Sequence, residues 1–130
     1  MAQGPTSATC APNDLSCRSE ITGNFVASAE HHAAMLYHDE GSAYFHTHGN
    51  VVDQRPMSDP HGWWWSWAAA WADTESNILI AGNWARGVNR SDMAAGHNLV
   101  LVNNTLLPEG AAWPPGAAAV IAAAGPRGAR

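Results

Sequence analysis

One short pattern recurs four times along this 130-residue chain, and it restricts the folds that the sequence can adopt. Each copy has an apolar or β-branched residue, a variable residue, Gly or Asn, then Asn, and then apolar residues. The copies occupy residues 21–26, 47–52, 80–84 and 101–106. The asparagines that they share are Asn24, Asn50, Asn83 and Asn104. A unit that returns every 20 to 30 residues or so is typical of a solenoid, in which similar units stack on one another.

The residues before each asparagine alternate in character, as in Phe45 and Thr47 against His46 and His48. A period of two indicates a β-strand with one set of side chains inside and the other outside. Asparagine tolerates the left-handed backbone conformation and can hydrogen-bond to the backbone. We therefore expect the four asparagines at turns between strands, stacked in one column. An antiparallel β-sandwich or barrel is the alternative.

The C-terminal part differs from the repeats, because residues 113–125 are rich in alanine, with prolines near the start and Gly125 at the end. Proline suits the first positions of a helix, and glycine suits the residue after its end. We expect a short helix that covers the open end of the stack. The chain then divides into an N-terminal extension (1–17), β coils (18–107), and a C-terminal cap and tail (108–130).

Charge excludes some classes of partner. Charged residues make up 13% of the chain and the net charge is −5, with scattered arginines and no lysine. Without a basic patch to neutralise phosphates, we expect no nucleic-acid partner. No apolar run reaches the roughly 20 residues of a transmembrane helix, so we expect no membrane partner. The two cysteines, Cys10 and Cys17, can form a disulfide or remain free thiols.

Several further segments occur in a distinctive order. They are 36–42 (Leu-Tyr-His-Asp-Glu-Gly-Ser), 44–52 (Tyr-Phe-His-Thr-His-Gly-Asn-Val-Val), 65–67, 77–83, 98–105 and 113–125. Their order over residues 18–125 resembles that of bacterial right-handed β-helix proteins of the pectate-lyase-like superfold. The resemblance implies an all-β fold, namely a short right-handed parallel β-helix of about four coils with a C-terminal capping helix. It also implies a secreted, extracellular location.

The same resemblance implies activity on a polysaccharide, because the family contains glycoside hydrolases and polysaccharide lyases. The chain departs from the family in length, since family members have several hundred residues and many more coils. An alternative is therefore a non-catalytic, glycan-binding or structural end of a larger β-helix. An exposed coil end would also favour a homo-oligomer. The second departure is histidine at positions 46 and 48, where Thr-like residues are expected.

Asp39 and Glu40 are the candidate catalytic carboxylates, since glycoside hydrolysis needs two carboxyl groups that flank the bond. Neighbouring residues of a strand point to opposite faces, so a partner from another coil is also possible. His38 and Tyr37 would orient these carboxylates and the substrate. The structural alternative is that Asp39 caps the turn at Gly41.

Aromatic residues and one arginine are candidates for binding sugar. Trp63, Trp65 and Trp67 share one face if their segment is a strand, and indole rings stack on the apolar faces of sugars. Packing in the core is the alternative for these residues. Arg86 can bind the carboxylate of an acidic sugar, or it can form an ion pair with nearby Asp92.

His46 and His48 are two apart, so a strand would project both rings from one face as ligands for Zn or Cu. His61 or His38 can supply a third ligand. The spacing His-x-His resembles the zinc motif of JAMM-type isopeptidases, whose glutamate would be Glu20 or Glu30, and also the first cupin motif. A metal-dependent enzyme is therefore the third hypothesis, although no cofactor is required by the first two. Solvent-exposed histidines with no ligand are the alternative.

Overall fold

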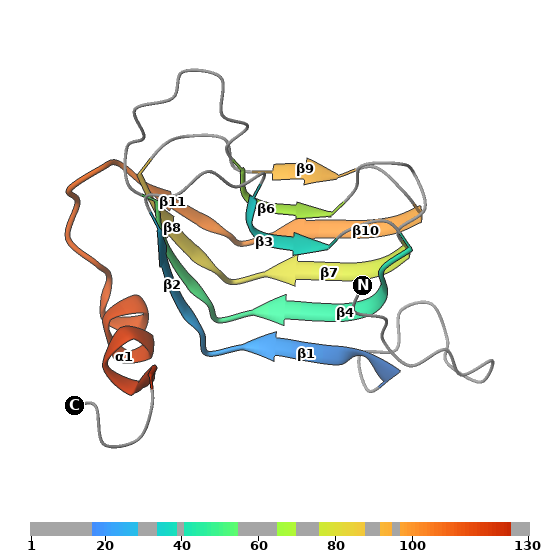
Figure 1. Ribbon diagram of the computed structural model, residues 1–130, viewed down its shortest axis with the longest axis horizontal. Helices are drawn as coiled ribbons and strands as arrows, with labels where there is room; N and C mark the ends of the chain where they lie inside the picture. Colours follow the sequence, from blue (N-terminus) through green and yellow to red (C-terminus); the bar gives the residue numbers. More distant parts are fainter. Residues whose placement is uncertain are drawn as a thin grey trace.

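The computed structural model describes residues 17–28, 34–38, 41–54, 65–69, 76–87, 92–94 and 97–125, and these contain mainly β-strands (Figure 1). The strands are β1 (Ser19–Thr22), β2 (Phe25–Ser28), β3 (Ala34–His38), β4 (Ala43–His48), β5 (Val51–Gln54), β6 (Trp65–Ala69), β7 (Ser76–Ala81), β8 (Trp84–Arg86), β9 (Asp92–Ala94), β10 (His97–Val102) and β11 (Thr105–Leu107). One helix, α1 (Pro115–Ala123), follows them.

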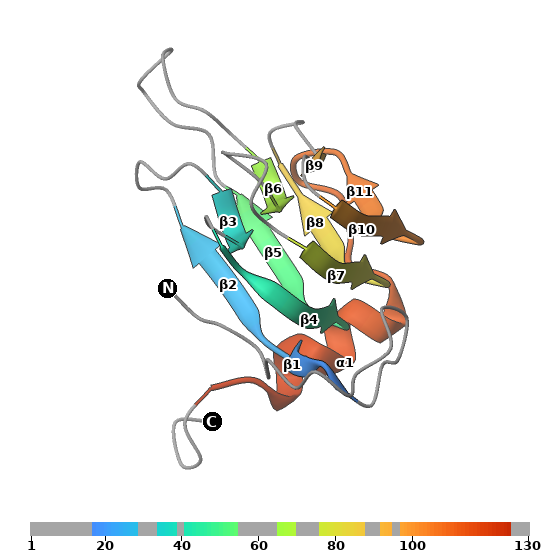
Figure 2. The same cartoon turned by 90° about the vertical axis from the view of Figure 1, so that its right-hand side faces the viewer.

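The strands form three parallel sheets that the chain visits in rotation. Sheet A has the order β1-β4-β7-β10, sheet B has β11-β8-β5-β2, and sheet C has β3-β6-β9. Each pairing between the described strands is parallel and joins a strand to the one three places along the chain. Figures 1 and 2 show that the strands within each sheet run in the same direction. The expected alternative of an antiparallel sandwich or barrel is therefore wrong for the described strands.

The interior lies between the sheets, and β4 and β7 line it with every second residue. In β4 and β7 burial alternates along the last four residues, so Phe45, Thr47, Ile78 and Ile80 are buried while their neighbours are partly exposed. Val52 packs with these apolar side chains. The period of two that the sequence predicted for these segments is confirmed. The residues between the buried ones therefore lie on the outer face of sheet A.

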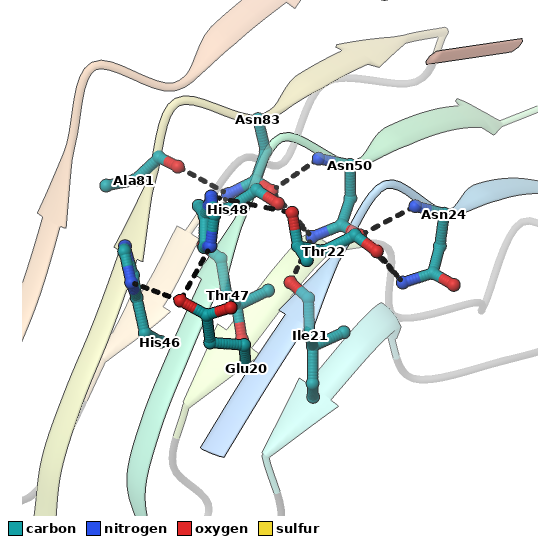
Figure 3. Close-up of polar contacts among 10 residues, drawn as sticks. All are labelled: Glu20, Ile21, Thr22, Asn24, His46, Thr47, His48, Asn50, Ala81 and Asn83. Atoms are coloured by element: carbon teal, nitrogen blue, oxygen red, sulfur yellow. Dashed lines mark hydrogen bonds and ion pairs between the residues drawn. The ribbon is translucent and has the colours of Figure 1, made fainter. Parts of the chain in front are cut away.

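The four repeat asparagines stack in one column, as predicted, at the corner between sheets A and B. Figure 3 shows three of them, Asn24, Asn50 and Asn83. The Nδ2 group of Asn24 donates to Oδ1 of Asn50 at 2.9 Å, and the same contact joins Asn50 to Asn83 and Asn83 to Asn104. The backbone N–H of each donor asparagine points to the same oxygen. These amides therefore tie each corner to the next.

The backbone reason for the corner differs from the prediction. The left-handed residue is the one before each column asparagine, namely Gly23, Gly49, Gly82 and Asn103, with φ between 57° and 70°. The column asparagines themselves do not have positive φ. Glycine meets no steric penalty in this conformation, and it makes the bend at three corners while Asn103 makes it at the fourth. The column asparagine that follows makes the hydrogen bonds.

A second left-handed position recurs near the start of the sheet A strands. Asn77 and Asn98 have φ of 55° and 56°, and Nδ2 of Asn98 donates to Oδ1 of Asn77 at 2.8 Å. Tyr44 takes the equivalent place in β4, since Ala43 pairs with Ser76, and its φ is 60°. A tyrosine in this conformation is uncommon, because its Cβ crowds the backbone.

The C-terminal helix forms as predicted, but it does not cover an end of the stack. Helix α1 contacts β5, and Gly116 lies against the ring of Trp84 in β8, so the helix packs beside sheet B (Figure 1). Ala117 is its buried residue. The prediction of an end cap is therefore wrong, because the small residues of this helix fit closely against the side of the sheet.

Candidate functional site

The outer face of sheet A brings together three side chains from two neighbouring strands. Because Phe45 and Thr47 point inward, His46 and His48 of β4 point outward. In the parallel register Glu20 lies beside His46, and Thr22 lies beside His48. Local strand geometry therefore places one carboxylate, two imidazoles and one hydroxyl on the same patch of surface (Figure 3).

The three ligand-type groups form a compact cluster, which we call the Glu–His–His cluster (Glu20, His46 and His48). Oε1 of Glu20 is 3.5 Å from Nε2 of His48 and 4.0 Å from Nδ1 of His46. One donor atom from each residue lies within 4.8 Å of the others. The side chain of Glu20 is 59% exposed, whereas those of His46 and His48 are 17% and 33% exposed. Neighbouring atoms therefore restrict the two imidazole rings, whereas the more exposed Glu20 side chain has room to rotate.

The two imidazoles stack, and one ring nitrogen lacks a hydrogen bond. Their centroids are 4.0 Å apart with an angle of 23° between the planes. Nδ1 of His48 lies 3.5 Å from the hydroxyl of Thr22. Nε2 of His48 is shielded from solvent and makes no hydrogen bond within the described part of the chain. A shielded polar atom of this kind costs free energy unless a partner satisfies it.

The surroundings favour a neutral imidazole at His46. Burial lowers the pKa of His46 below its usual value of 6.5, and the neighbouring His48 lowers it further. Glu20 opposes this shift, while the positive charge of Arg18 adds to it. A neutral ring is the form in which histidine coordinates a metal.

Two predicted metal ligands, His46 and His48, therefore lie together, while the third, His61, falls outside the described residues. The third member of the cluster is Glu20, which the sequence offered as one of two glutamates in the isopeptidase alternative. A clearer signal was available, because Glu20 and His46 each lie four residues before a column asparagine. Aligning the repeats on Asn24 and Asn50 would have paired them.

The predicted catalytic residues are only partly described. Asp39 and Glu40 lie outside the described residues, directly after β3. Tyr37, which precedes them, is 38% exposed. His38 is buried, its Nε2 is 2.7 Å from the hydroxyl of Thr47, and its ring centroid is 5.0 Å from that of Phe45. His38 thus lies in the interior and not on a surface that a polysaccharide can reach.

The side chains of the three tryptophans predicted to bind sugar are not described. Trp63 lies outside the described residues, and Trp65 and Trp67 lie in β6, where only the strand is described.

Among residues whose side chains the structure describes, Arg86 contacts Asp53, Ala111 and Trp113, while the side chain of Asp92 falls outside that description. Its guanidinium donates to both carboxylate oxygens of Asp53, at 3.1 and 2.8 Å, and to the carbonyl of Ala111 at 2.8 Å. It also lies over the ring of Trp113 at 4.2 Å. Arg86 therefore forms an ion pair, and the register explains its partner, because it places Asp53 beside Arg86. A guanidinium held in this way joins sheet B to the segment before α1.

No family model, curated protein or solved structure matches the chain. Among the described residues, no helix has the length and apolar character needed to cross a membrane. Cys17 takes part in a disulfide, and the other cysteine of the chain, Cys10, falls outside the described residues.

Proposed function

We propose that this chain is part of a right-handed parallel β-helix and that it acts on, or binds, a polysaccharide. The observation that carries the proposal is the rotation of the strands through three parallel sheets, with each strand paired to the one three places along the chain. Four units would then correspond to about four coils. Crossover connections between parallel strands are almost always right-handed, which supports the proposed hand.

The surface chemistry is consistent with a neutral or weakly charged glycan as the partner. Few charged residues cover the chain, and Tyr37 offers an exposed aromatic ring at 38% exposure. Aromatic rings stack on the apolar faces of sugars. The disulfide at Cys17 supports the proposal of a secreted protein, because disulfides persist mainly in oxidising compartments.

Asp39 and Glu40 remain the proposed acid, base or nucleophile, since they follow Tyr37 closely along the chain. The second form of the proposal is a non-catalytic module that binds glycans through the same region. In the described part, β1 and β2 at one end of the stack and β10 and β11 at the other have a partner on one side only. Association of chains through these edges is the proposed route to an oligomer.

The test uses the full chain and a panel of neutral and acidic polysaccharides. Reducing-end release measures hydrolysis, absorbance of an unsaturated product measures lyase activity, and affinity electrophoresis measures binding. We expect binding to at least one polysaccharide and, for an enzyme, loss of cleavage in Asp39→Asn or Glu40→Gln. Glu109→Gln is the matched control, because Glu109 is exposed in a turn after the last strand. Absence of both binding and cleavage across the panel would contradict the proposal.

A further inference from the structure

We infer that Glu20, His46 and His48 bind one divalent transition-metal ion, and that Zn²⁺ is the ion their donors suit best. This inference is independent of the polysaccharide proposal. It depends on the geometry of the cluster, whose three donor atoms lie within 4.8 Å of one another on two paired strands. Two imidazole nitrogens and one carboxylate oxygen form a donor set typical of Zn²⁺ sites, and Cu²⁺ accepts the same donors.

The separations of the donor atoms are close to those that a bound ion requires. With bonds of about 2.0–2.1 Å and tetrahedral angles, neighbouring ligand atoms are about 3.3 Å apart. Oε1 of Glu20 is already 3.5 Å from Nε2 of His48 and 4.0 Å from Nδ1 of His46. A small rotation of the exposed Glu20 side chain brings its oxygen to an ion held by both rings. Three protein donors leave one position open for water or a ligand oxygen.

The backbone holds the two rings in place before any ion binds. Thr47 lies between the two histidines in sequence, is fully buried, and contacts His38 through its hydroxyl. Since this residue cannot turn outward, its neighbours cannot turn inward. Parallel pairing of β4 with both β1 and β7 fixes the strand on either side. The site therefore costs little conformational entropy to assemble, apart from the ordering of Glu20.

An independent observation at His48 points to an ion. Nε2 of His48 is shielded, has no hydrogen bond within the described residues, and faces the Glu20 carboxylate (Figure 3). The other ring nitrogen, Nδ1, faces the hydroxyl of Thr22 at 3.5 Å. Histidine ligands commonly donate their second ring N–H to an oxygen while the first nitrogen holds the metal. A metal at Nε2 satisfies the shielded atom, and Thr22 orients the ring.

The competing explanation is an imidazolium–carboxylate ion pair with no metal. The distance between Glu20 and His48 permits such a pair. Stacked rings with centroids 4.0 Å apart disfavour two positive charges, however, so a proton can satisfy only one of the two imidazoles. A metal ion satisfies both rings and the carboxylate together.

The experiment titrates Zn²⁺ into the full chain by isothermal titration calorimetry after a chelator has removed bound metals. A second measurement records the visible absorption spectrum of the Co²⁺-substituted protein. We expect one Zn²⁺ per chain at the cluster and a tetrahedral Co²⁺ spectrum. The double variant His46→Gln, His48→Gln should lose this ion. Glu20→Gln should weaken binding by about tenfold or more. His97→Gln is the matched control, because His97 is exposed on β10 and lies outside the cluster.

Two outcomes would overturn the inference. One is no binding of Zn²⁺ or Cu²⁺ by the wild-type chain, which would leave the ion-pair explanation. The other is equal stoichiometry and affinity in the double variant, which would place the ion on other residues. Far-ultraviolet circular dichroism of the metal-free variants checks folding, and ¹⁵N resonances of the histidine rings provide a second measure. Zn²⁺ should shift Nε2 of His48 while Nδ1 keeps its proton.

Discussion

Replacement of Asn50 by alanine is expected to be among the most damaging single changes in the column of asparagines. Oδ1 of Asn50 accepts from the backbone N–H and from Nδ2 of Asn24, at 3.1 and 2.9 Å. Its Nδ2 donates to the carbonyls of Ile21 and His48 and to Oδ1 of Asn83, at 2.8, 3.1 and 2.9 Å. Asn50 is fully buried. Alanine leaves several buried or half-buried groups without partners, at about 1–3 kcal/mol for each unsatisfied group.

These terms give a loss of roughly 3–5 kcal/mol in the free energy of unfolding, a large part of the 5–15 kcal/mol or so of a typical domain. Asn24→Ala is the matched control, because Asn24 is exposed and its side chain donates to Oδ1 of Asn50 and to the carbonyl of Thr22, while its backbone N–H keeps its bond to Asn50 in the variant. We expect it to cost about 1 kcal/mol or less. Urea denaturation, followed by circular dichroism and tryptophan fluorescence with a chelator present, measures both values. Equal losses for the two variants would refute the reasoning.

Three further predictions concern the interior and the turns. Burial lowers the pKa of His38 from 6.5 to about 4, so the unfolded chain binds a proton between these pH values that the folded chain does not. The contribution of neutral His38 to the free energy of unfolding should be fully present above pH 6.5 and should fall by about 3 kcal/mol as the pH is lowered to 4. Denaturation of His38→Leu over the same pH range should show a smaller fall. Tyr44→Asn should raise the free energy of unfolding by about 0.5 kcal/mol, since asparagine tolerates positive φ and can bond to Asn77; a lower urea midpoint would contradict this. Gly87→Ala should cost on the order of 2 kcal/mol or more, because its Cβ would overlap the backbone oxygen of Gln54 at a φ of 119°; an unchanged thermal midpoint would show that the turn adapts.

The repeats allowed much of the fold to be predicted from the sequence. Alternation around Phe45 and Thr47 gave the strand and its inward face, and the shared asparagines gave the stacked corner. The same alignment also contained two pairs that were missed. Glu20 with His46 lies four residues before the column, and Asp53 with Arg86 lies three residues after it. Once the asparagines are aligned, parallel pairing makes such residues neighbours.

Other features depend on packing that no local pattern encodes. The alanine-rich helix was recognisable, but its position beside sheet B follows from the fit of Gly116 against Trp84, whose contact is between distant parts of the chain. The left-handed residue of each corner was assigned to asparagine because both Gly and Asn adopt that conformation. The two roles are separated by the hydrogen bonds of the column, which occupy the side-chain amides of the asparagines that follow the left-handed residues.

The column of amides has a direction, and this restricts how chains can join end to end. Each side-chain oxygen receives its hydrogen bonds from the asparagine nearer the N-terminus, so the two ends of the column are chemically different. A second chain can continue the series only in the same orientation, with its Asn104 meeting Asn24 of the first. Such head-to-tail contacts do not close a two-fold dimer; repeated, they build a filament. Any dimer with two-fold symmetry must interrupt the series of amides.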